Sequence, residues 1–463
     1  MYLCKLDQKE VAMQQITTRD GFASKFGVLV AAAGSAVGLG NLWRFPYLVG
    51  ENGGSAFIII YIAFMVILCM PVLVAEFVIG RRSGRDVMGA FDVLAPRTPW
   101  KGIGLLGLTA ALVIIGFYCV VGGWTLAYVA NSFFPSFLTQ SETGFADSFQ
   151  TLTASPIQPL IWSFLFILLT ALVVIGGVKN GIERYSKILM PLLFVMVVVL
   201  AVRALTLDTE MKGLQFLFQP DFSKVNGGTF IAALGQAFFS LSIGMGAMIT
   251  YGSYVPKSSN LIKTSCGVMS TDVLFSLLAG LAVIPAVFAF NIPPEQGPGL
   301  VFVTFPEIFS QLPFGNVLSV IFFILLAIAA LTSAISLLEV LVAYLVDARR
   351  MSRRKAVILV SLVVVVLSVL ASLSLGTLSH IKILGKNFFE CCDSLSANVL
   401  LPMGGLFICL FVGWYMKPAD LRDELTNGGK IRAPLFNAIL FVLRYATPVA
   451  ILLIFASGMG WLG

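Results

Sequence analysis

Charged residues are scarce in this sequence: they make up 11% of 463 residues, against about 25% in an ordinary soluble domain. Hydrophobic residues account for 58%, too many to bury in one water-soluble core. They fall in blocks of about 20 or more, the length that a helix needs to cross about 30 Å of hydrocarbon. We therefore expect an all-α integral membrane protein that contacts the lipid bilayer along most of its length.

Two further patterns are missing. Short stretches that alternate apolar and polar residues, typical of a membrane β-barrel, are lacking, and the run from Val357 to Leu375 is apolar without alternation. The first twenty residues are polar and carry no signal-peptide core or cleavage site. The first span should therefore remain in the protein, preceded by a cytoplasmic tail at 1–20.

Residues for metal binding and catalysis are also few. The seven cysteines are scattered without metal-ligand spacing, and the adjacent Cys391 and Cys392 are poorly placed to bridge each other. The single histidine, His380, lies in an expected loop, with no Ser/His pair and no paired carboxylates on one helix face. We expect no disulfide framework, no transition metal and no enzyme activity.

Polar punctuation divides the chain into about eleven expected helices. The bounds are 21–48, 55–80, 102–135, 157–177, 186–206, 228–255, 264–290, 315–346, 355–376, 388–416 and 434–461. The net charge of +7 comes largely from alternate loops, which favours a positive cytoplasmic face over binding to nucleic acid. The expected outer loops at 136–156 and 291–314 contain no Lys or Arg. This places the N-terminus inside and, with an odd number of spans, the C-terminus outside a cell membrane.

Two spans are interrupted near their middle. The first contains AGSAVGLGN at 33–41 and the sixth contains SLSIGMG at 240–246, although each glycine costs about 1 kcal/mol in a helix. They hold equivalent places in two five-span halves, 21–206 and 228–416, with span 434–461 added. Since five is odd, the halves are inverted repeats, and paired broken helices predict a binding site at mid-membrane. Close helix packing is the alternative reading of these glycines.

The residues from Gly34 to Gly54, GSAVGLGNLWRFPYLVGENGG, resemble the first-span signature of the neurotransmitter:sodium symporter family. The similarity continues through GQAFFSLS at 235–242, KNGIER at 179–184 and LTS at 331–333. With eleven spans, the chain resembles a bacterial branch that carries hydrophobic amino acids. The resemblance implies a sodium-coupled symporter that imports apolar, aliphatic or aromatic, L-amino acids by alternating access.

The resemblance also implies two sodium sites. The first consists of the Ala36 carbonyl, the side chains of Asn41, Ser240 and Asp272, and the substrate carboxylate. An ionised Asp272 at membrane depth calls for a cation beside it. The second consists of the carbonyls of Gly34, Val37 and Ala329 with the hydroxyls of Thr332 and Ser333. These hydroxyls could instead bond to their own helix.

For the substrate, the resemblance places the carboxylate on the N–H groups of Leu39 and Gly40 and on the Tyr118 hydroxyl. Amine-carrying relatives have Asp where Gly38 stands, so a substrate with its own carboxylate is favoured here. The rest of the pocket is predominantly apolar, with Met245 as an adaptable wall. Its side chains are Ile114, Tyr118, Phe239, Ser242, Met245 and Leu337.

The resemblance further implies two gates. Arg44 and Asp393 match the outer pair, above Phe239 and Tyr118. The inner pair matches Arg19 and Asp347, with Phe22 and Tyr254 nearby, although Arg19 could simply snorkel at a span end.

The sequence leaves open whether the protein binds chloride. Tyr61, Gln236, Ser240 and Ser276 match a chloride site, whereas Glu76 or Asp272 could supply the negative charge instead. A channel is the remaining alternative, but it would need a continuous polar pore. The sequence indicates no oligomeric state.

Overall fold

The structure is a computed structural model that describes residues 21–139, 142–290 and 298–460. Within these residues nine helices are long and apolar enough to cross a membrane. They are Ser55–Ser83 (α5, η1, α6), Lys101–Ser132 (α8), Gln158–Ile175 (α10), Val178–Leu207 (η3, α11), Leu261–Phe290 (α15), Gly315–Arg349 (α17), Arg353–Leu373 (α18), Phe388–Tyr415 (α19, η6, α20, η7) and Phe436–Gly458 (α22, η8, α23). The all-α membrane fold expected from the sequence is confirmed.

The first expected span is a tenth, broken one. It consists of α2 (Lys25–Ala36) followed by α3 (Leu39–Leu42) and α4 (Arg44–Glu51), with a bend of 62°. Val37 and Gly38 have extended backbone angles. The break that was expected between Gly34 and Asn41 therefore lies at these two residues.

The sixth expected span is also broken. It consists of α13 (Gly227–Ser240) and α14 (Ala247–Gly252), and the connecting turn has positive φ at Ser242, Gly244 and Gly246. Glycine adopts these angles without a steric penalty. Close packing contributes as well: a Cβ on Gly244 would lie 2.4 Å from the Leu401 carbonyl oxygen of α20. Both readings of the glycines therefore hold at this turn.

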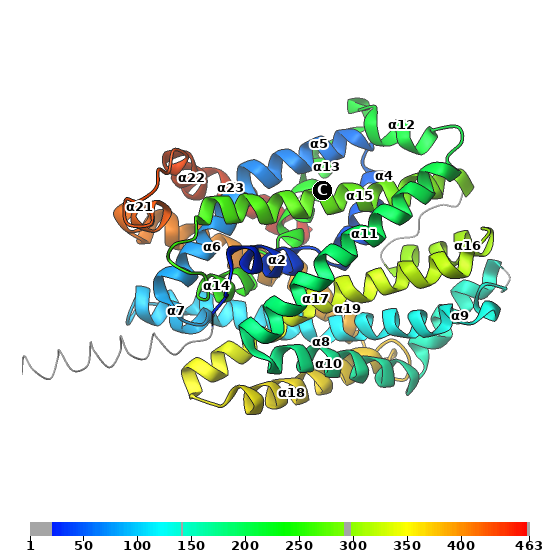
Figure 1. The fold of residues 1–463 in the computed structure, drawn as a ribbon, viewed down its shortest axis with the longest axis horizontal. Coiled ribbons are helices and arrows are strands. Elements are labelled where there is room, and N and C mark those ends of the chain that lie inside the picture. Colours follow the sequence, from blue (N-terminus) through cyan, green and yellow to red (C-terminus); the bar gives the residue numbers. More distant parts are fainter. Residues whose placement is uncertain (1–20, 140–141, 291–297, 461–463) are drawn as a thin grey trace, which may run out of the picture.

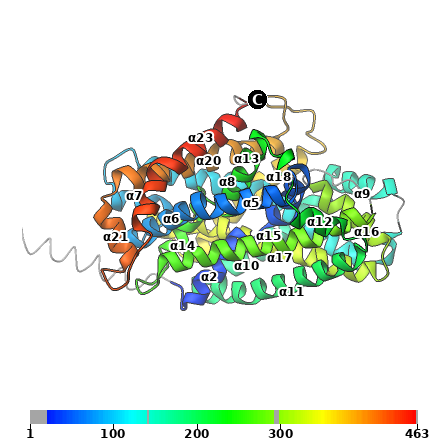
Figure 2. The same ribbon diagram turned by 90° about the horizontal axis from the view of Figure 1, so that it is seen from above.

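The helices pack in two groups (Figure 1). In one group α2 packs on α15, α6 on α14 and α5 on α13; in the other α8 packs against α10, α17 and α18. The groups meet where α2 contacts α17. In the view turned by 90°, α21 (Pro418–Thr426) lies at the same end of the molecule as α7 (Val87–Leu94). The helices α9 (Glu142–Ala154) and α16 (Phe305–Ser310) lie at the other end (Figure 2).

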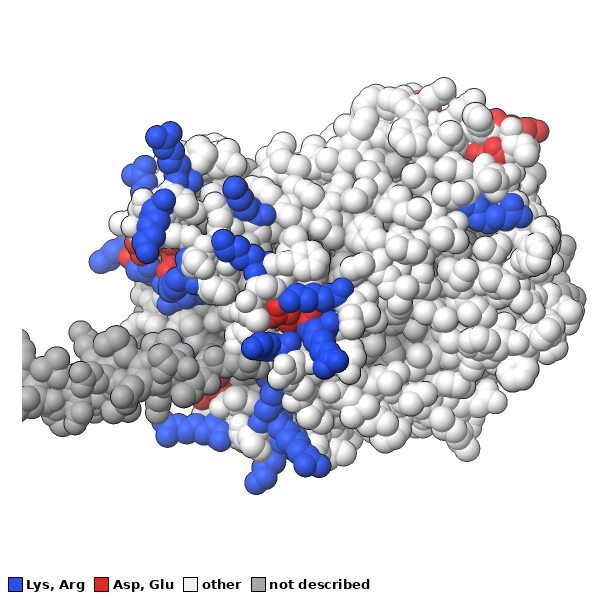
Figure 3. Space-filling view, in the orientation of Figure 1, with Lys and Arg blue, Asp and Glu red and all other residues white. Residues whose placement is uncertain are grey.

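Lys and Arg gather at the end that carries α7 and α21 and are sparse over the remainder of the visible face (Figure 3). This asymmetry agrees with the expected cytoplasmic side. The division into two inverted repeats, 21–206 and 228–416, remains a prediction.

Candidate functional site

A buried polar cluster lies beside the break of the first span. Asn41 of α3, Ser240 at the end of α13 and Asp272 of α15 are each at most 3% exposed. The Ser240 hydroxyl donates to both carboxylate oxygens of Asp272 at 2.8 Å, and the Asn41 amide donates to Asp272 Oδ1 at 2.9 Å. The three side chains expected at the first sodium site therefore meet, and α2 ends at the fourth, Ala36.

A third donor to the Asp272 carboxylate is the Tyr61 hydroxyl, at 3.1 Å. The three donors, Asn41, Ser240 and Tyr61, are neutral, and the carboxylate is fully buried in the middle of α15. Burying a carboxylate among neutral groups is costly unless it gains a cation. The geometry therefore fits a bound monovalent cation at this carboxylate.

The Asn41 amide is oriented as a donor here. Its Nδ2 lies 2.9 Å from Ser240 Oγ and 2.8 Å from Ser276 Oγ, in addition to Asp272. Two amide hydrogens cannot serve three acceptors fully. Turning the amide end for end would bring Oδ1 among the same oxygens and provide a further ligand for a cation.

The second expected sodium site lies where α2 meets α17. A Cβ on Gly34 would lie 3.3 Å from Thr332 Cβ, so these two positions are adjacent. The Thr332 hydroxyl bonds to the carbonyls of Ile328 and Ala329 in its own helix, as the alternative reading allowed. The Ser333 hydroxyl instead donates to the Ser35 carbonyl of α2 at 3.4 Å. Val37, whose carbonyl is the remaining expected ligand of this site, is the first residue of the break.

The expected carboxylate-binding groups lie together at the break. The Tyr118 hydroxyl of α8 interacts with the Leu39 backbone and the Ser333 hydroxyl. A Cβ on Gly38 would lie 3.4 Å from that hydroxyl and 2.8 Å from Ser333 Oγ. A side chain at position 38 would therefore occupy the space in front of Tyr118.

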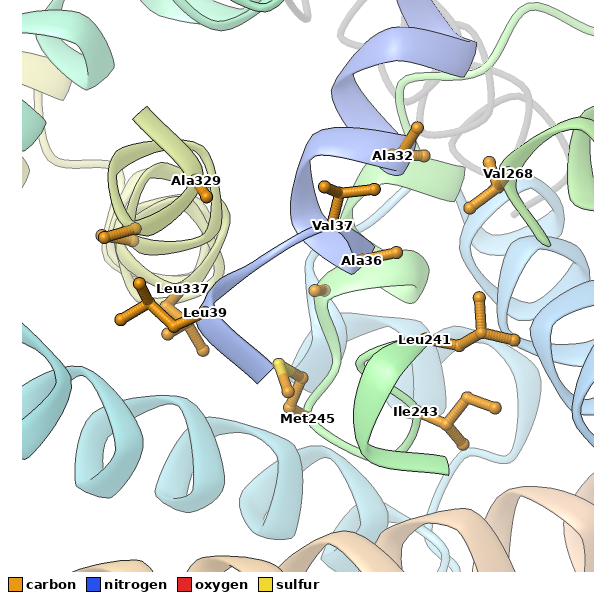
Figure 4. Packing of buried hydrophobic residues seen from close by; sticks show 14 of the residues in the cluster. Ala32, Ala36, Val37, Leu39, Leu241, Ile243, Met245, Val268, Ala329 and Leu337 are labelled. Carbon is orange, nitrogen blue, oxygen red and sulfur yellow. The ribbon is translucent and has the colours of Figure 1, made fainter. Parts of the chain in front are cut away.

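The apolar side chains expected around the substrate are buried. Ile114, Met245 and Leu337 are 6%, 6% and 3% exposed. Figure 4 shows the unwound segment of the first span passing from α2 toward α17, with Leu39 on the side of Leu337 and Met245 in the turn of the sixth span. Ser242 turns toward the first span and donates to the Ser35 carbonyl at 2.9 Å.

The residues expected at the outer gate lie near one another, beyond the break of the first span. The Arg44 guanidinium lies over the Phe239 ring, 5.0 Å from its centroid, and interacts electrostatically with Asp393 of α19. A Cβ on Gly40 would lie 2.7 Å from the same ring. Phe239 therefore packs against α3, just after the break, while the Arg44 guanidinium lies over the Phe239 ring.

The expected inner gate is described in part, because Arg19 lies outside the described residues. The Phe22 ring packs edge-on against the rings of Tyr251 and Tyr254, at centroid distances of 5.7 and 6.2 Å. Asp347 accepts a hydrogen bond from the Asp86 backbone N–H at 2.9 Å. The three aromatic rings thus pack together at the position expected for the inner gate.

Sequence reasoning missed a second polar group at this end. Glu339 of α17 is fully buried, accepts a 2.7 Å hydrogen bond from the Tyr254 hydroxyl and pairs with Arg353 of α18. Arg353 also donates to the Val174 carbonyl of α10 at 2.7 Å. A buried glutamate on an apolar span was the available signal, since such residues are rare without a role.

Of the four residues that match a chloride site, three contact the cluster of Asn41 and Asp272, and the fourth, Gln236, contacts the first span instead. Tyr61, Ser240 and Ser276 surround the cluster of Asn41 and Asp272. The Gln236 amide donates to the Gly40 carbonyl at 3.5 Å, while its Oε1 is buried without a described partner.

The other carboxylate considered, that of Glu76, has its hydrogen bond with the turn of the sixth span, whereas Asp272 accepts from Tyr61 and Ser240. The Glu76 carboxylate accepts from the Gly244 backbone N–H at 2.8 Å and braces this turn. Asp272 is therefore the carboxylate at the candidate chloride position.

Comparisons with known proteins identify relatives along most of the chain. Residues 19–142 and 154–460 match the sequence profile described as the sodium:neurotransmitter symporter family. The chain is 38% identical over 439 residues to the uncharacterized sodium-dependent transporter YhdH of Bacillus subtilis (strain 168), covering 95% of this chain and 97% of that protein. It is 30% identical to the uncharacterized sodium-dependent transporter MJ1319 of Methanocaldococcus jannaschii, covering 89% of this chain and 85% of that protein.

A solved structure is similar along nearly the whole chain. The crystal structure of MhsT in complex with L-phenylalanine superposes with a TM-score of 0.87 at 44% identity, covering 95% of this chain and all of that chain.

Proposed function

We propose that this chain, which belongs to the sodium:neurotransmitter symporter family and is a sodium-dependent transporter, imports apolar L-amino acids by alternating access. The observation that carries the proposal is the Asp272 carboxylate, fully buried among neutral donors beside the breaks of the first and sixth spans. A sodium ion there would neutralise the carboxylate and lie next to the substrate's own carboxylate.

The proposal includes two sodium ions. The first is bound by Ala36, Asn41, Ser240 and Asp272, together with the substrate. The second is bound by Gly34, Val37, Ala329, Thr332 and Ser333; the Thr332 hydroxyl donates its hydrogen to its own helix, which leaves its oxygen lone pairs for the ion. Because the substrate carboxylate is itself one of the ligands of the first sodium ion, the ion and the substrate should bind cooperatively.

The substrate class follows from the break and its surroundings. Gly38 leaves space and no negative charge in front of Tyr118, so a substrate carboxylate can approach the Leu39 and Gly40 N–H groups. Ile114, Met245 and Leu337 then surround an apolar side chain. The relative MhsT has been solved in complex with L-phenylalanine, which supports an aromatic or large aliphatic amino acid.

Chloride is not required in this proposal. The Asp272 carboxylate accepts from Tyr61 and Ser240, two of the residues matched to a chloride site, and so supplies the negative charge there. The transport cycle moves the group containing α2, α6, α13 and α15 against the group of α8, α10, α17 and α18. The N-terminus lies in the cytoplasm and the C-terminus outside the cell membrane.

The direct test is uptake of labelled L-phenylalanine into proteoliposomes that contain the purified protein. An inward sodium gradient should drive accumulation, and replacing external sodium with potassium should abolish it. Replacing chloride with gluconate should leave uptake unchanged. Equal uptake in sodium and potassium would contradict the coupling, and loss in gluconate would contradict the role given to Asp272.

A further inference from the structure

A cavity of about 670 Å³ lies apart from the central site, between the end of α8, the helix α9 and the start of α10. Its volume is within the range of small-molecule sites, roughly 300–1,000 Å³. Its lining includes the buried side chains of Tyr128, Phe137 and Leu152. None of the residues assigned to sodium, substrate or gates lines it.

The lining has an apolar part and a negatively charged polar part. The Tyr128 and Phe137 rings meet edge to face at 5.4 Å, while Asn131, Asp147 and Gln158 contribute polar side chains. Asp147 carries the one formal charge among these lining residues. A ligand with an apolar body and a positive charge would complement both parts.

The cavity is connected to the outer gate by aromatic contacts. The Tyr128 ring packs on Phe302 of η5 (Leu300–Thr304) at 4.9 Å, and Phe302 packs on Trp124 at 5.9 Å. Trp124 stacks with Phe389 at 5.9 Å. Phe389 belongs to α19 (Phe388–Leu395), the helix that also carries Asp393 of the gate.

We propose that the cavity under α9 binds a small organic cation with an apolar body, such as an arylalkylamine, and that the occupied cavity restrains the outer gate. The helix α9, which borders the cavity, lies at the end opposite the Lys- and Arg-rich one (Figures 1 and 3). Its exposure to the cell exterior, and the gate that it restrains, rest on the proposed function. The ligand packs against Tyr128 and thereby limits movement of Phe302 and Phe389.

The binding test uses the purified full-length protein with saturating sodium and L-phenylalanine, so that the central site is filled. Titration with 2-phenylethylamine should show binding by calorimetry. The neutral 2-phenylethanol should bind about fivefold more weakly, the upper end of what an exposed charge pair contributes. The anionic 3-phenylpropanoate should bind more weakly still.

Asp147→Asn should reduce the affinity for the amine to that for the alcohol. Asp221→Asn, a matched change at an exposed residue of another loop, should leave it unchanged. Absence of amine binding, equal affinity for amine and alcohol, or insensitivity to Asp147→Asn would each overturn the site. Affinity that rises when L-phenylalanine is omitted would place the amine in the central site and overturn it equally.

The coupling test measures dissociation of labelled L-phenylalanine. Saturating 2-phenylethylamine should slow dissociation about fivefold or more, at the lower end of common coupling strengths. Phe302→Leu should bind the amine normally yet lose the slowing, and its retained amine binding shows that it is folded. An unchanged rate in the unsubstituted protein, or full slowing in Phe302→Leu, would overturn the coupling.

The two proposals fail separately. If the protein bound no L-phenylalanine with sodium, the proposed function would fail, while amine binding and its dependence on Asp147 would still be measured on the protein without amino acid.

Discussion

At the scale of single residues, Asp272 connects the ion to the substrate. Its carboxylate is held by Asn41, Ser240 and Tyr61, and the proposed sodium joins it to the substrate carboxylate. Asp272→Ala should therefore weaken sodium and L-phenylalanine together, by roughly 10- to 100-fold each, as for loss of a buried charged hydrogen-bonding group. Equilibrium binding at several sodium concentrations measures both.

The matched control is Ser276→Ala, which removes one neighbour of Asn41 but no proposed sodium ligand. It should retain both affinities within a few-fold. An Asp272→Ala protein that kept its affinity for the amino acid but lost its response to sodium would contradict shared ligation.

Gly38 provides a second residue-scale prediction. Gly38→Asp places a carboxylate where the substrate carboxylate approaches Tyr118, so it should abolish detectable binding of L-phenylalanine. Gly38→Asn has nearly the same size without the charge and separates crowding from repulsion. Thermal-shift measurements with and without L-phenylalanine distinguish the two variants. The amino acid should not raise the melting temperature of Gly38→Asp, and it should raise that of Gly38→Asn less than that of the unsubstituted protein. Undiminished binding by Gly38→Asp would show that the pocket lies elsewhere.

At the scale of elements, the helix α21, at the Lys- and Arg-rich end of the molecule (Figures 1 and 3), is fixed by ion pairs of the buried Glu424. Glu424 pairs with Arg81 at 2.7 Å and with Lys257 at 2.7 Å. Burial raises the pKa of Glu424, but the hydrogen bond from Lys257 and the charge of Arg81 outweigh it and hold the pKa below its ordinary value. These ion pairs therefore join α21 to the end of α6 and to the loop before α15.

This shift fixes the sign of a pH effect. Because the folded-state pKa is lowered, the stabilisation is complete above the unfolded pKa, about 4.3, and is lost as the pH falls through the folded value. Glu424→Gln should lower stability at pH 7 by about 2 kcal/mol, and the difference from the unsubstituted protein should vanish at acid pH. Melting temperatures in detergent from pH 3 to 7 measure this, with the exposed Asp423→Asn as control. A difference that persisted at pH 3 would contradict it.

Sequence patterns predicted the elements better than their connections. Runs of apolar residues predicted the spans, and GSAVGLGN predicted the first break because glycine disfavours a helix. The meeting of Asn41 with Asp272, 231 positions apart, came from family resemblance and not from periodicity. The role of Glu339 was missed because its partners, Tyr254 and Arg353, lie on other spans. Tertiary contacts of this kind leave no local pattern.

At the scale of the whole molecule, the distribution of Lys and Arg determines orientation. The basic end in Figure 3 should face the cytoplasm. A C-terminal fusion to alkaline phosphatase, which is active only outside, should therefore be active. A fusion that ends at Met351, between α17 and α18, should be inactive, and fusions to a cytoplasm-dependent fluorescent protein should give the opposite pattern. Two inactive phosphatase fusions would place the C-terminus inside.

The glycine contact between the sixth span and α20 has a consequence for how selectivity varies among related sequences. A Cβ on Gly404 would lie 2.4 Å from the Gly244 carbonyl oxygen, just as one on Gly244 would meet Leu401. The turn that presents Met245 thus rests directly on a neighbouring backbone, without a side chain to absorb a change. Substitutions along α20, which contributes no residue to the proposed pocket, should shift Met245 and alter preference among substrates, so surveys confined to pocket-lining positions would overlook them.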